Sequence, residues 1–151
     1  MNEEKWMKEA IKQALKAYKE DEVPIGCVIV KDNKIISRGY NKREKNQISM
    51  DHAEMIAIKK ACKKLGSWRL EDCDLYVTLE PCPMCAGAII QSRIRKVIYG
   101  ASDPKGGSVK SVVQLFDIKE YNHHPEYISG IYEKECSELL TDFFKSKRKV
   151  K

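Results

Sequence analysis

The chain has 151 residues, of which 42% are apolar and 33% are charged. This size and composition predict one compact domain spanning residues 1–151. They exclude a membrane-spanning protein, because no apolar run approaches the length of a helix that crosses a bilayer. The first nine residues carry charges throughout and give no signal for export. Six cysteines in such a chain favour a protein of the reducing cytoplasm over a disulfide framework.

The net charge is +6, and most of it lies at the C-terminal end. Five of the last seven residues are basic, and without them the chain has 23 basic and 22 acidic side chains. A terminal segment of this kind is either a solvated helix end or a binding site for nucleic acid. The charge alone favours neither interpretation.

The first part of the chain predicts a helix followed by a β-hairpin. Residues 3–20 place apolar side chains near helical spacing, and Pro24 ends that pattern. Residues 25–30 form a nearly continuous apolar run, Asp32-Asn33 is a turn signal, and residues 34–40 form a second β-prone run. We expect the first of these two strands to be buried on both faces.

A second helix is predicted over residues 52–65. Asp51 stands where a residue could cap its start, and Gly66 stands where it would end. The side chains expected on its inner face are those of Ala53, Ile56, Ala57 and Ala61.

Strand and helix patterns alternate in the second half of the chain. Residues 75–79 are β-prone, a helix begins near Pro83, and residues 96–99 form another strand, which predicts a parallel crossover. Gly106-Gly107 marks a loop, residues 109–124 give no clear pattern, and residues 131–149 predict a final amphipathic helix. No repeat or linker divides the chain. The predicted fold class is α/β, a three-layer α/β/α sandwich.

Two short motifs thirty residues apart carry the chemistry: HAE at residues 52–54 and PCPMC at residues 81–85. His52, Cys82 and Cys85 supply three zinc ligands, and no fourth ligand occurs at a comparable spacing. Structural zinc takes four protein ligands, whereas catalytic zinc takes three and leaves a position for water. The pattern therefore predicts a catalytic zinc ion. The remaining cysteines are expected to be inert and mostly buried: Cys27, Cys62, Cys73 and Cys136.

Both motifs are expected at helix N-termini, where the helix dipole favours thiolates and hence metal ligation. Glu54 is then placed to take a proton from a metal-activated water and to pass protons to a ring nitrogen and a departing amine. This arrangement suits hydrolytic removal of an amino group from a heterocycle.

Other interpretations of the same residues are open. Asp51 and Glu54 have the spacing of a capping box, so Glu54 could serve the helix start alone. A Cys-x-x-Cys motif by itself could be redox-active or structural. The coincidence of His-x-Glu with Pro-Cys-x-x-Cys, each expected to open a helix, favours catalytic zinc.

Six segments resemble the zinc-dependent nucleoside and nucleobase deaminases, and specifically the bacterial tRNA-specific adenosine deaminases. The resemblance covers nearly the whole chain and implies a cytidine deaminase-like fold with a central mixed five-stranded sheet. The segments are residues 22–26 (EVPIG), 51–54 (DHAE), 75–88 (LYVTLEPCPMCAGA), 100–103 (GASD), 122–123 (NH) and 139–148 (LLTDFFKSKR).

The resemblance implies conversion of the wobble adenosine of a tRNA to inosine, with the base extruded from the anticodon loop into the zinc pocket. It further implies one Zn²⁺ per subunit, a homodimer, and a tRNA-Arg with A at the wobble position as substrate. A smaller deaminase substrate, such as guanine, cytosine or a free nucleoside, is the alternative, and a non-catalytic zinc-binding module is a second one. The basic C-terminus favours RNA, because a free base needs no attraction for a polyanion.

Residue roles also follow from the resemblance. Glu54 would protonate N1 of adenine and the leaving ammonia, and the backbone N–H of Ala53 would hold the purine edge. The other residues expected to contact the nucleoside or its flanking sugar are Asn41, Pro24, Ile25, Leu79, Pro81 and Asp103. Those expected to contact the anticodon loop are Lys105, Asn122, His123, Phe144 and Arg148, whereas Phe143 is expected in the core.

Overall fold

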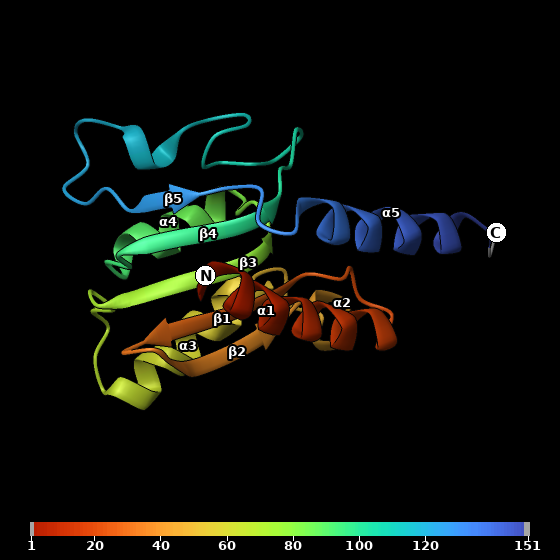
Figure 1. Ribbon diagram of the computed structural model, residues 1–151, viewed down its shortest axis with the longest axis horizontal. Helices are drawn as coiled ribbons and strands as arrows, with labels where there is room; N and C mark the ends of the chain where they lie inside the picture. Colours follow the sequence, from red (N-terminus) through yellow and green to blue (C-terminus); the bar gives the residue numbers. More distant parts are fainter. Residues whose placement is uncertain (1, 150–151) are drawn as a thin grey trace.

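The computed structural model describes residues 2–149, and its centre is a mixed five-stranded sheet with the order β2-β1-β3-β4-β5 (Figure 1). Strand β1 is antiparallel to both β2 and β3, whereas β3, β4 and β5 run parallel. The mixed five-stranded sheet and the parallel crossover are thus confirmed. The strands are β1 (Gly26–Lys31), β2 (Lys34–Tyr40), β3 (Cys73–Leu79), β4 (Lys96–Ala101) and β5 (Glu126–Ile128).

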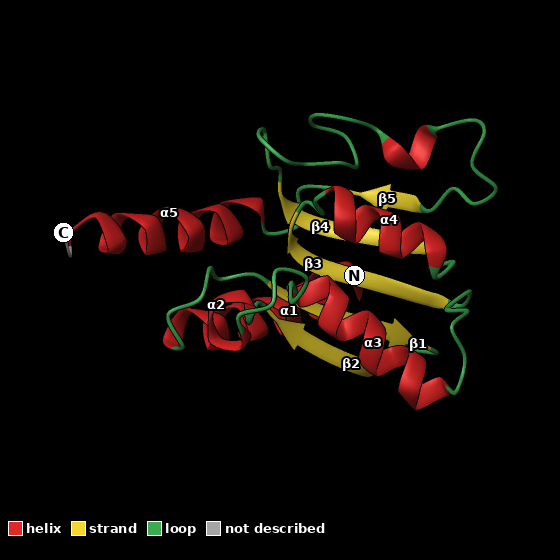
Figure 2. Ribbon diagram, turned by 180° about the vertical axis from the view of Figure 1, so that it is seen from behind, coloured by secondary structure: helices red, strands yellow, loops and turns green. Residues whose placement is uncertain are grey.

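Helices cover both faces of this sheet (Figures 1 and 2). Two helices, α1 (Asn2–Lys19) and α5 (Glu133–Lys149), lie on one face, and α5 extends beyond the sheet toward the C-terminus. The opposite face is covered by α3 (Ala53–Leu65) and α4 (Pro83–Gln91). The predicted three-layer α/β/α sandwich is therefore confirmed. Within residues 2–149, no helix has the length and apolar character needed to cross a membrane.

Strand β1 is buried on both faces, as its apolar run predicted. Cys27 and Ile29 pack in the core beneath α3 and α4. Val28 and Val30 point the other way and pack against α1. Because successive side chains of a strand alternate between faces, only a run of apolar residues can fill both cores.

The hairpin turn also matches its prediction. Asp32 and Asn33 have φ values of 50° and 62°, the left-handed conformation that both central residues of a type I′ turn require. Asparagine and aspartate tolerate this conformation better than most residues, so the Asp-Asn pair fixes the register of β1 and β2.

The start of α3 differs from the prediction. His52 is the N-cap residue, and no side chain caps the helix. Asp51 lies outside the helix, and its carboxylate accepts a hydrogen bond from the Asn46 side chain at 2.7 Å. The prediction of an Asp51 cap is wrong because residues 47–52 turn before the helix begins, with Gln47 in the left-handed region. Gly66 does end the helix, with φ 65°.

The other differences concern short elements and helix ends. Helix α5 starts at Glu133 because Tyr132 takes a positive φ of 55°. Ile56 is only half-buried, and Ile58 takes the deeper position in the core. Residues 109–124 are largely irregular. The sequence pattern missed the helical turn α2 (Arg43–Asn46), the 3-10 helix η1 (Leu115–Asp117) and the position of β5.

Candidate metal centre and active site

The two motifs meet where α3 and α4 begin. His52 is the N-cap of α3 and Cys82 is the N-cap of α4, with Pro83 at the first helical position and Cys85 in the first turn. The Nδ1 atom of His52 lies 3.6 Å from the Sγ atom of each cysteine. All three ligand atoms lie within 4.8 Å of one another. Segments thirty residues apart in sequence therefore converge as the motif spacing predicted.

This geometry fits zinc. A tetrahedral zinc ion with bonds of about 2.05 Å to nitrogen and about 2.3 Å to sulfur holds those ligands about 3.6 Å apart. Within residues 2–149, this trio is the one group of histidine, cysteine and acidic side chains close enough to hold a metal. Three ligands leave the fourth tetrahedral position for water. The cofactor is accordingly zinc.

The pKa values of the two cysteine thiols favour binding of a cation. A hydrogen bond from the Cys85 thiol lowers the pKa of Cys82 to about 4, although burial opposes this shift. The same hydrogen bond raises the pKa of Cys85, because its proton is held between the two sulfur atoms. A metal cation in place of that shared proton would favour both thiolates, since zinc ligands must be deprotonated.

Glu54 lies beside these ligands and is only 4% exposed. Burial, the largest cause, raises the pKa of Glu54 to about 7, because desolvation penalises the carboxylate. The nearby Cys82 thiolate raises the pKa further, while the His52 ring lowers it. A carboxyl group whose pKa lies near neutrality can both accept and donate a proton, as a proton shuttle must.

The capping-box interpretation of Glu54 does not fit this structure. Glu54 is the second residue of α3, one position short of where a capping-box acid lies relative to the N-cap His52. The backbone N–H of His52 donates instead to the carbonyl of Met50 at 2.8 Å. Glu54 is therefore available for chemistry.

A hollow of about 130 Å³ opens next to the metal ligands. The side chain of Asn41 braces its wall: its amide nitrogen donates to the Val23 carbonyl at 3.4 Å, and its oxygen accepts the Arg43 N–H at 3.2 Å. Asn41 reaches this space from the end of β2, and His52 and Ala53 reach it from the start of α3. The lining residues are Val23, Ile25, Asn41, Arg43, His52 and Ala53.

This metal-side hollow continues toward α5. A neighbouring hollow of about 360 Å³ shares Val23, Asn41 and Arg43 with it and is also lined by Phe143 and Lys147. The ring of Phe143 is buried and packs edge-on against Tyr18 at 5.6 Å between centroids, so its predicted place in the core is confirmed. The two hollows adjoin at their three shared residues, and together we call them the path toward α5; Asp21, Glu22 and Glu44 also line the second hollow.

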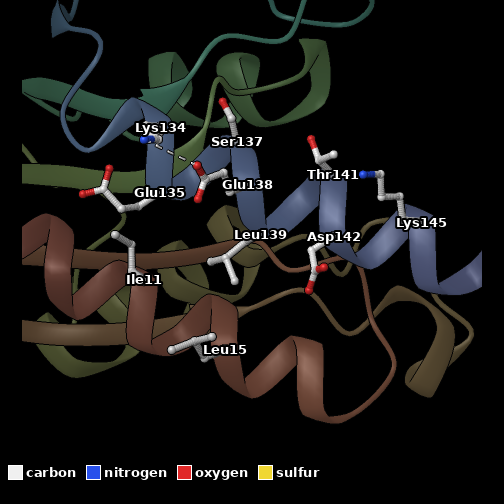
Figure 3. A pocket seen from close by; sticks show the side chains of 10 residues that line it. All are labelled: Ile11, Leu15, Lys134, Glu135, Ser137, Glu138, Leu139, Thr141, Asp142 and Lys145. Carbon is white, nitrogen blue, oxygen red and sulfur yellow. Dashed lines mark ion pairs between the residues drawn. The ribbon is translucent and has the colours of Figure 1, made fainter.

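A larger groove of about 670 Å³ lies between α1 and α5 (Figure 3). Ile11 and Leu15 of α1 face Leu139 of α5, and the Lys134–Glu138 ion pair lies along the rim. None of the proposed metal ligands lines this groove, and it holds no group of metal-binding side chains. Volume alone therefore does not identify the active site in this molecule.

Only some of the other predicted site residues line the metal-side hollow. Ile25, Asn41 and Ala53 line the metal-side hollow together. Pro24 and Pro81 are buried, and Leu79 and Asp103 are half-buried; none of the four is among the residues that line this hollow. Arg43 and Val23 do line it and were missed by the sequence reasoning. The sequence signals that pointed to this region were the predicted site residues next to them, Pro24 and Ile25 beside Val23 and Asn41 near Arg43.

The residues expected to contact RNA lie in three places. Lys105 is exposed in the loop after β4, and Phe144, 46% exposed, and Arg148 lie on α5. Asn122 lines a separate hollow beside α4, and the His123 ring hydrogen-bonds to the carbonyl of Ile94 at 2.7 Å. Phe144 packs against Phe143, which lines the hollow next to the metal-side one, at 5.5 Å between ring centroids, whereas Arg148, Asn122 and His123 are not among the residues that line either hollow.

Comparison with known proteins gives a consistent family. The MafB19-like deaminase family model matches residues 1–148. The tRNA-specific adenosine deaminase of Bacillus subtilis (strain 168) is 53% identical over 149 residues, which cover 99% of this chain and 92% of that protein. The protein of the same name from Agrobacterium fabrum (strain C58 / ATCC 33970) is 49% identical, with 95% and 94% covered.

Solved structures give the same result. One from biochemical and structural studies of A-to-I editing by tRNA:A34 deaminases has a TM-score of 0.86 at 47% identity, covering 89% of this chain and 97% of that chain. The guanine deaminase of Nitrosomonas europaea has a TM-score of 0.74 at 20% identity, covering 91% and 81%, and shows the shared fold alone. The chain therefore belongs to the MafB19-like deaminases and, within them, to the tRNA-specific adenosine deaminases.

Proposed function

We propose that this protein is an enzyme that hydrolytically deaminates the wobble adenosine in the anticodon loop of a tRNA. Adenosine and water become inosine and ammonia. The observation that carries the proposal is the three-ligand metal centre with the buried Glu54 beside it, in a chain that belongs to the tRNA-specific adenosine deaminases.

The chemistry divides between the metal and the protein. Zinc, when bound by His52, Cys82 and Cys85, supplies a water of lowered pKa. Glu54 would accept one proton from that water and deliver it to N1 of adenine while the water oxygen bonds to C6. It would then carry the second proton from this oxygen to the amino group, which would leave as ammonia when the C6–N6 bond breaks. Burial supports this role, because it raises the pKa of Glu54 to about 7 and so makes both proton transfers feasible near neutral pH.

The hollow beside the metal supplies the binding contacts. Ala53 is the first residue of α3, so its backbone N–H has no partner within the helix and is free to hold the purine edge. Asn41 is fixed by its two hydrogen bonds and contacts the nucleoside. Ile25 lines the hollow and forms one wall around the base. Pro24, Leu79 and Pro81, which lie outside the lining of the hollow, complete the walls when the base is bound, and Asp103 contacts a flanking sugar.

The path toward α5 supports a polynucleotide substrate over a free base. Lys145, Lys147 and Arg148 are exposed on this helix, and Lys147, which forms an ion pair with Asp21, lines the hollow that adjoins the metal-side one. Cationic side chains attract the phosphates of RNA but add little affinity for an uncharged base. The proposed contacts to the anticodon loop are Lys105, Asn122, His123, Phe144 and Arg148.

Three finer proposals accompany the reaction. The substrate is a tRNA-Arg with A at the wobble position. The protein is a homodimer, which is supported by exposed apolar side chains, among them Met50, Trp68 and Val112, each more than half exposed. The third is that residues 1–151 are one domain and that the protein is cytoplasmic; a single sheet with strands from both halves of the chain supports the one-domain part. Sedimentation velocity at micromolar concentration tests the dimer, and a purely monomeric boundary would exclude it.

A transcript of tRNA-Arg with A at the wobble position tests the reaction. After incubation with the zinc-loaded protein, reverse transcription should read G at that position and A at every other adenosine. The same transcript with C at the wobble position is the matched control. Turnover of guanine, cytosine or a free nucleoside without inosine in the tRNA would establish the smaller substrate, and inactivity of the zinc-loaded protein on all of them would establish the non-catalytic module.

A further inference from the structure

Glu80 is a buried carboxylate that the proposed reaction does not use. It follows β3, lies two positions before the ligand Cys82, and is only 2% exposed. Within residues 2–149, no lysine or arginine forms an ion pair with it. Because a buried charge without a cation must be compensated by hydrogen bonds, its partners show what it does.

Five donors from one loop surround this carboxylate. Its Oε1 atom accepts the backbone N–H of Asp103 at 3.0 Å and the hydroxyl of Ser111 at 2.5 Å. Its Oε2 atom accepts the backbone N–H groups of Val109, Lys110 and Ser111 at 3.2, 2.8 and 2.9 Å. The loop of residues 103–111 thus closes around a single side chain that reaches it from the adjacent strand.

The fit between loop and carboxylate is tight. A Cβ atom on Gly107 would lie 2.3 Å from the carboxyl group of Glu80 and 2.6 Å from the carbonyl oxygen of Asp103, so only glycine lets the loop pass at this distance. The backbone N–H of Ser108 donates to the carbonyl of Pro81 at 2.9 Å. The loop is therefore attached to both residues that precede the metal ligand Cys82.

The loop also has hydrogen bonds of its own: the Asp103 carboxylate accepts the backbone N–H groups of Lys105 and Gly106 at 3.1 and 3.2 Å, and the Asp103 carbonyl accepts that of Gly107 at 2.9 Å. These bonds lie within the loop, whereas those of Glu80 join the loop to the segment that carries Cys82. Residues 102–114 form no helix or strand, so their backbone N–H groups need partners outside a regular ladder. The same loop contains Asp103 and Lys105, for which we propose contacts to the RNA. Displacing the loop would move both residues relative to the metal ligands.

We propose that Glu80 is a positioning residue that ties the 103–111 loop, and with it the contacts of Asp103 and Lys105 to RNA, to the segment that carries Cys82. The proposal rests on the proposed function. The carboxylate does not touch the reacting atoms, and it acts through the loop that it holds.

Glu80→Gln tests this role, because glutamine keeps the size of the side chain but replaces one acceptor with a donor that faces backbone N–H groups. We expect the KM for a wobble-A anticodon stem-loop to rise about tenfold, the effect of leaving one or two buried donors without an acceptor. Zinc content should stay the same, and kcat should change by less than about threefold, as expected when substrate binding alone is weakened. Amide hydrogen exchange at residues 109–111 should become faster.

Asp74→Asn is the matched control. Asp74 lies on β3 at the end away from the metal, where it pairs with Arg95 at 3.0 Å. The same carboxylate-to-amide change at this position should leave both the KM and the exchange at residues 109–111 unchanged. A loss of zinc or of kcat in Glu80→Gln with an unchanged KM would overturn the proposal, because the carboxylate would then serve the metal segment.

Two further variants disturb the same interaction from the loop. Gly107→Ala keeps the carboxylate but introduces the clashing Cβ atom, and we expect the same rise in KM. Ser111→Ala removes one donor of five and should cause a smaller rise. These variants decide the question if Glu80→Gln does not fold, and an unchanged KM in both would overturn the proposal. Inactivity of the unaltered protein on the stem-loop would instead contradict the proposed function, while hydrogen exchange would still test the attachment of the loop.

Discussion

The Nδ1 atom of His52 lies 3.6 Å from the Sγ atom of Cys82, although thirty positions separate the two residues in sequence. Each residue is the N-cap of its helix, and both helices lie on the same face of the sheet. The sheet therefore brings the two helix starts together, and the metal centre depends on the fold as a whole.

Cys82→Ala should abolish both zinc binding and deamination. Removal of one of three ligands leaves two, and two ligands bind zinc too weakly to retain it when the protein is diluted. Elemental analysis should give about one zinc per chain for the unaltered protein and less than about a tenth of that for the variant. Cys73→Ala is the control, because Cys73 is a buried free cysteine that lies outside the metal group. Full zinc content in Cys82→Ala would show that Cys82 is not a ligand.

Glu54→Gln should lower kcat by roughly a hundredfold to ten-thousandfold while zinc stays bound, since general acid–base catalysis contributes about that much. The variant should fold normally, because burial already disfavours the charged form of Glu54 and the side chain caps no helix. Stopped assays of inosine formation and parallel elemental analysis make the measurement. Loss of zinc together with activity would identify Glu54 as a ligand.

Patterns within short stretches of sequence predicted most of the fold. The apolar run of β1, the Asp32-Asn33 turn and the Gly66 helix end are each determined by neighbouring residues, and each was confirmed. The Asp51 cap was wrong because a left-handed residue at Gln47 redirects the chain before α3. Strand β5 has three residues, too few to form a recognisable alternation.

In the site, as in the fold, local sequence patterns predicted some residues and missed others. The metal ligands occur in motifs whose spacing alone predicts zinc, and the structure brings them together. Arg43 lines the metal-side hollow because the turn of α2 places it there, and no periodicity marks that turn. Glu80 binds a loop 23 to 31 positions further along the chain, so its role depends on interactions that no local pattern contains.

Gly26→Ala should destabilise the protein. A Cβ atom on Gly26 would lie 2.1 Å from the carbonyl oxygen of Ala10, where α1 crosses β1. Overpacking of this kind should lower the free energy of unfolding by about 2–3 kcal/mol. Gly87→Ala is the control, because that glycine lies within α4 and a Cβ atom there meets nothing within 4 Å. Urea denaturation should show the control unchanged or more stable by up to about 1 kcal/mol, and equal effects of both changes would contradict the packing argument.

Tyr40→Phe should reveal a pH-dependent contribution to stability. The Tyr40 hydroxyl donates to Glu20 at 2.7 Å, which lowers the pKa of Glu20 and raises the pKa of Tyr40 to about 12. A lowered carboxyl pKa gives stability that is present above the usual pKa of glutamate and is lost as the pH falls through the folded value. A raised tyrosine pKa gives stability that is present below about pH 10 and is lost as the pH rises through the folded value.

The difference in Tm between the unaltered protein and Tyr40→Phe should therefore be largest, about two degrees, from about pH 6 to about pH 9, and should shrink toward either extreme. Thermal unfolding across this range makes the measurement. Tyr121→Phe is the control, since Tyr121 is exposed in a loop away from Glu20. A difference that does not vary with pH would show that packing of the ring, and not the hydrogen bond, sets the effect.

Removal of the basic end of the chain should weaken the reaction on tRNA and make it less sensitive to salt. Deletion of residues 145–151 removes five basic residues, Lys145, Lys147, Arg148, Lys149 and Lys151, the last of which lies outside the described part of the chain. In the unaltered protein, raising salt from about 50 to about 200 mM should lower kcat/KM by roughly tenfold or more, because binding releases cations from the phosphates and this release becomes less favourable as salt rises. The slope of log kcat/KM against log salt should become shallower by about one for each phosphate group that the truncated protein no longer neutralises.

A charge-matched control separates local binding from net charge. Lys63→Ala and Lys64→Ala remove two exposed cations from the last turn of α3, at the end of the helix opposite His52. If the basic end of α5 binds the anticodon stem-loop, this control keeps the salt slope of the unaltered protein, whereas Lys147→Ala with Arg148→Ala makes the slope shallower. Equal slopes for both pairs would mean that general electrostatic attraction, and not a site on α5, brings RNA to the metal centre. Turnover that does not depend on salt would contradict an RNA substrate altogether.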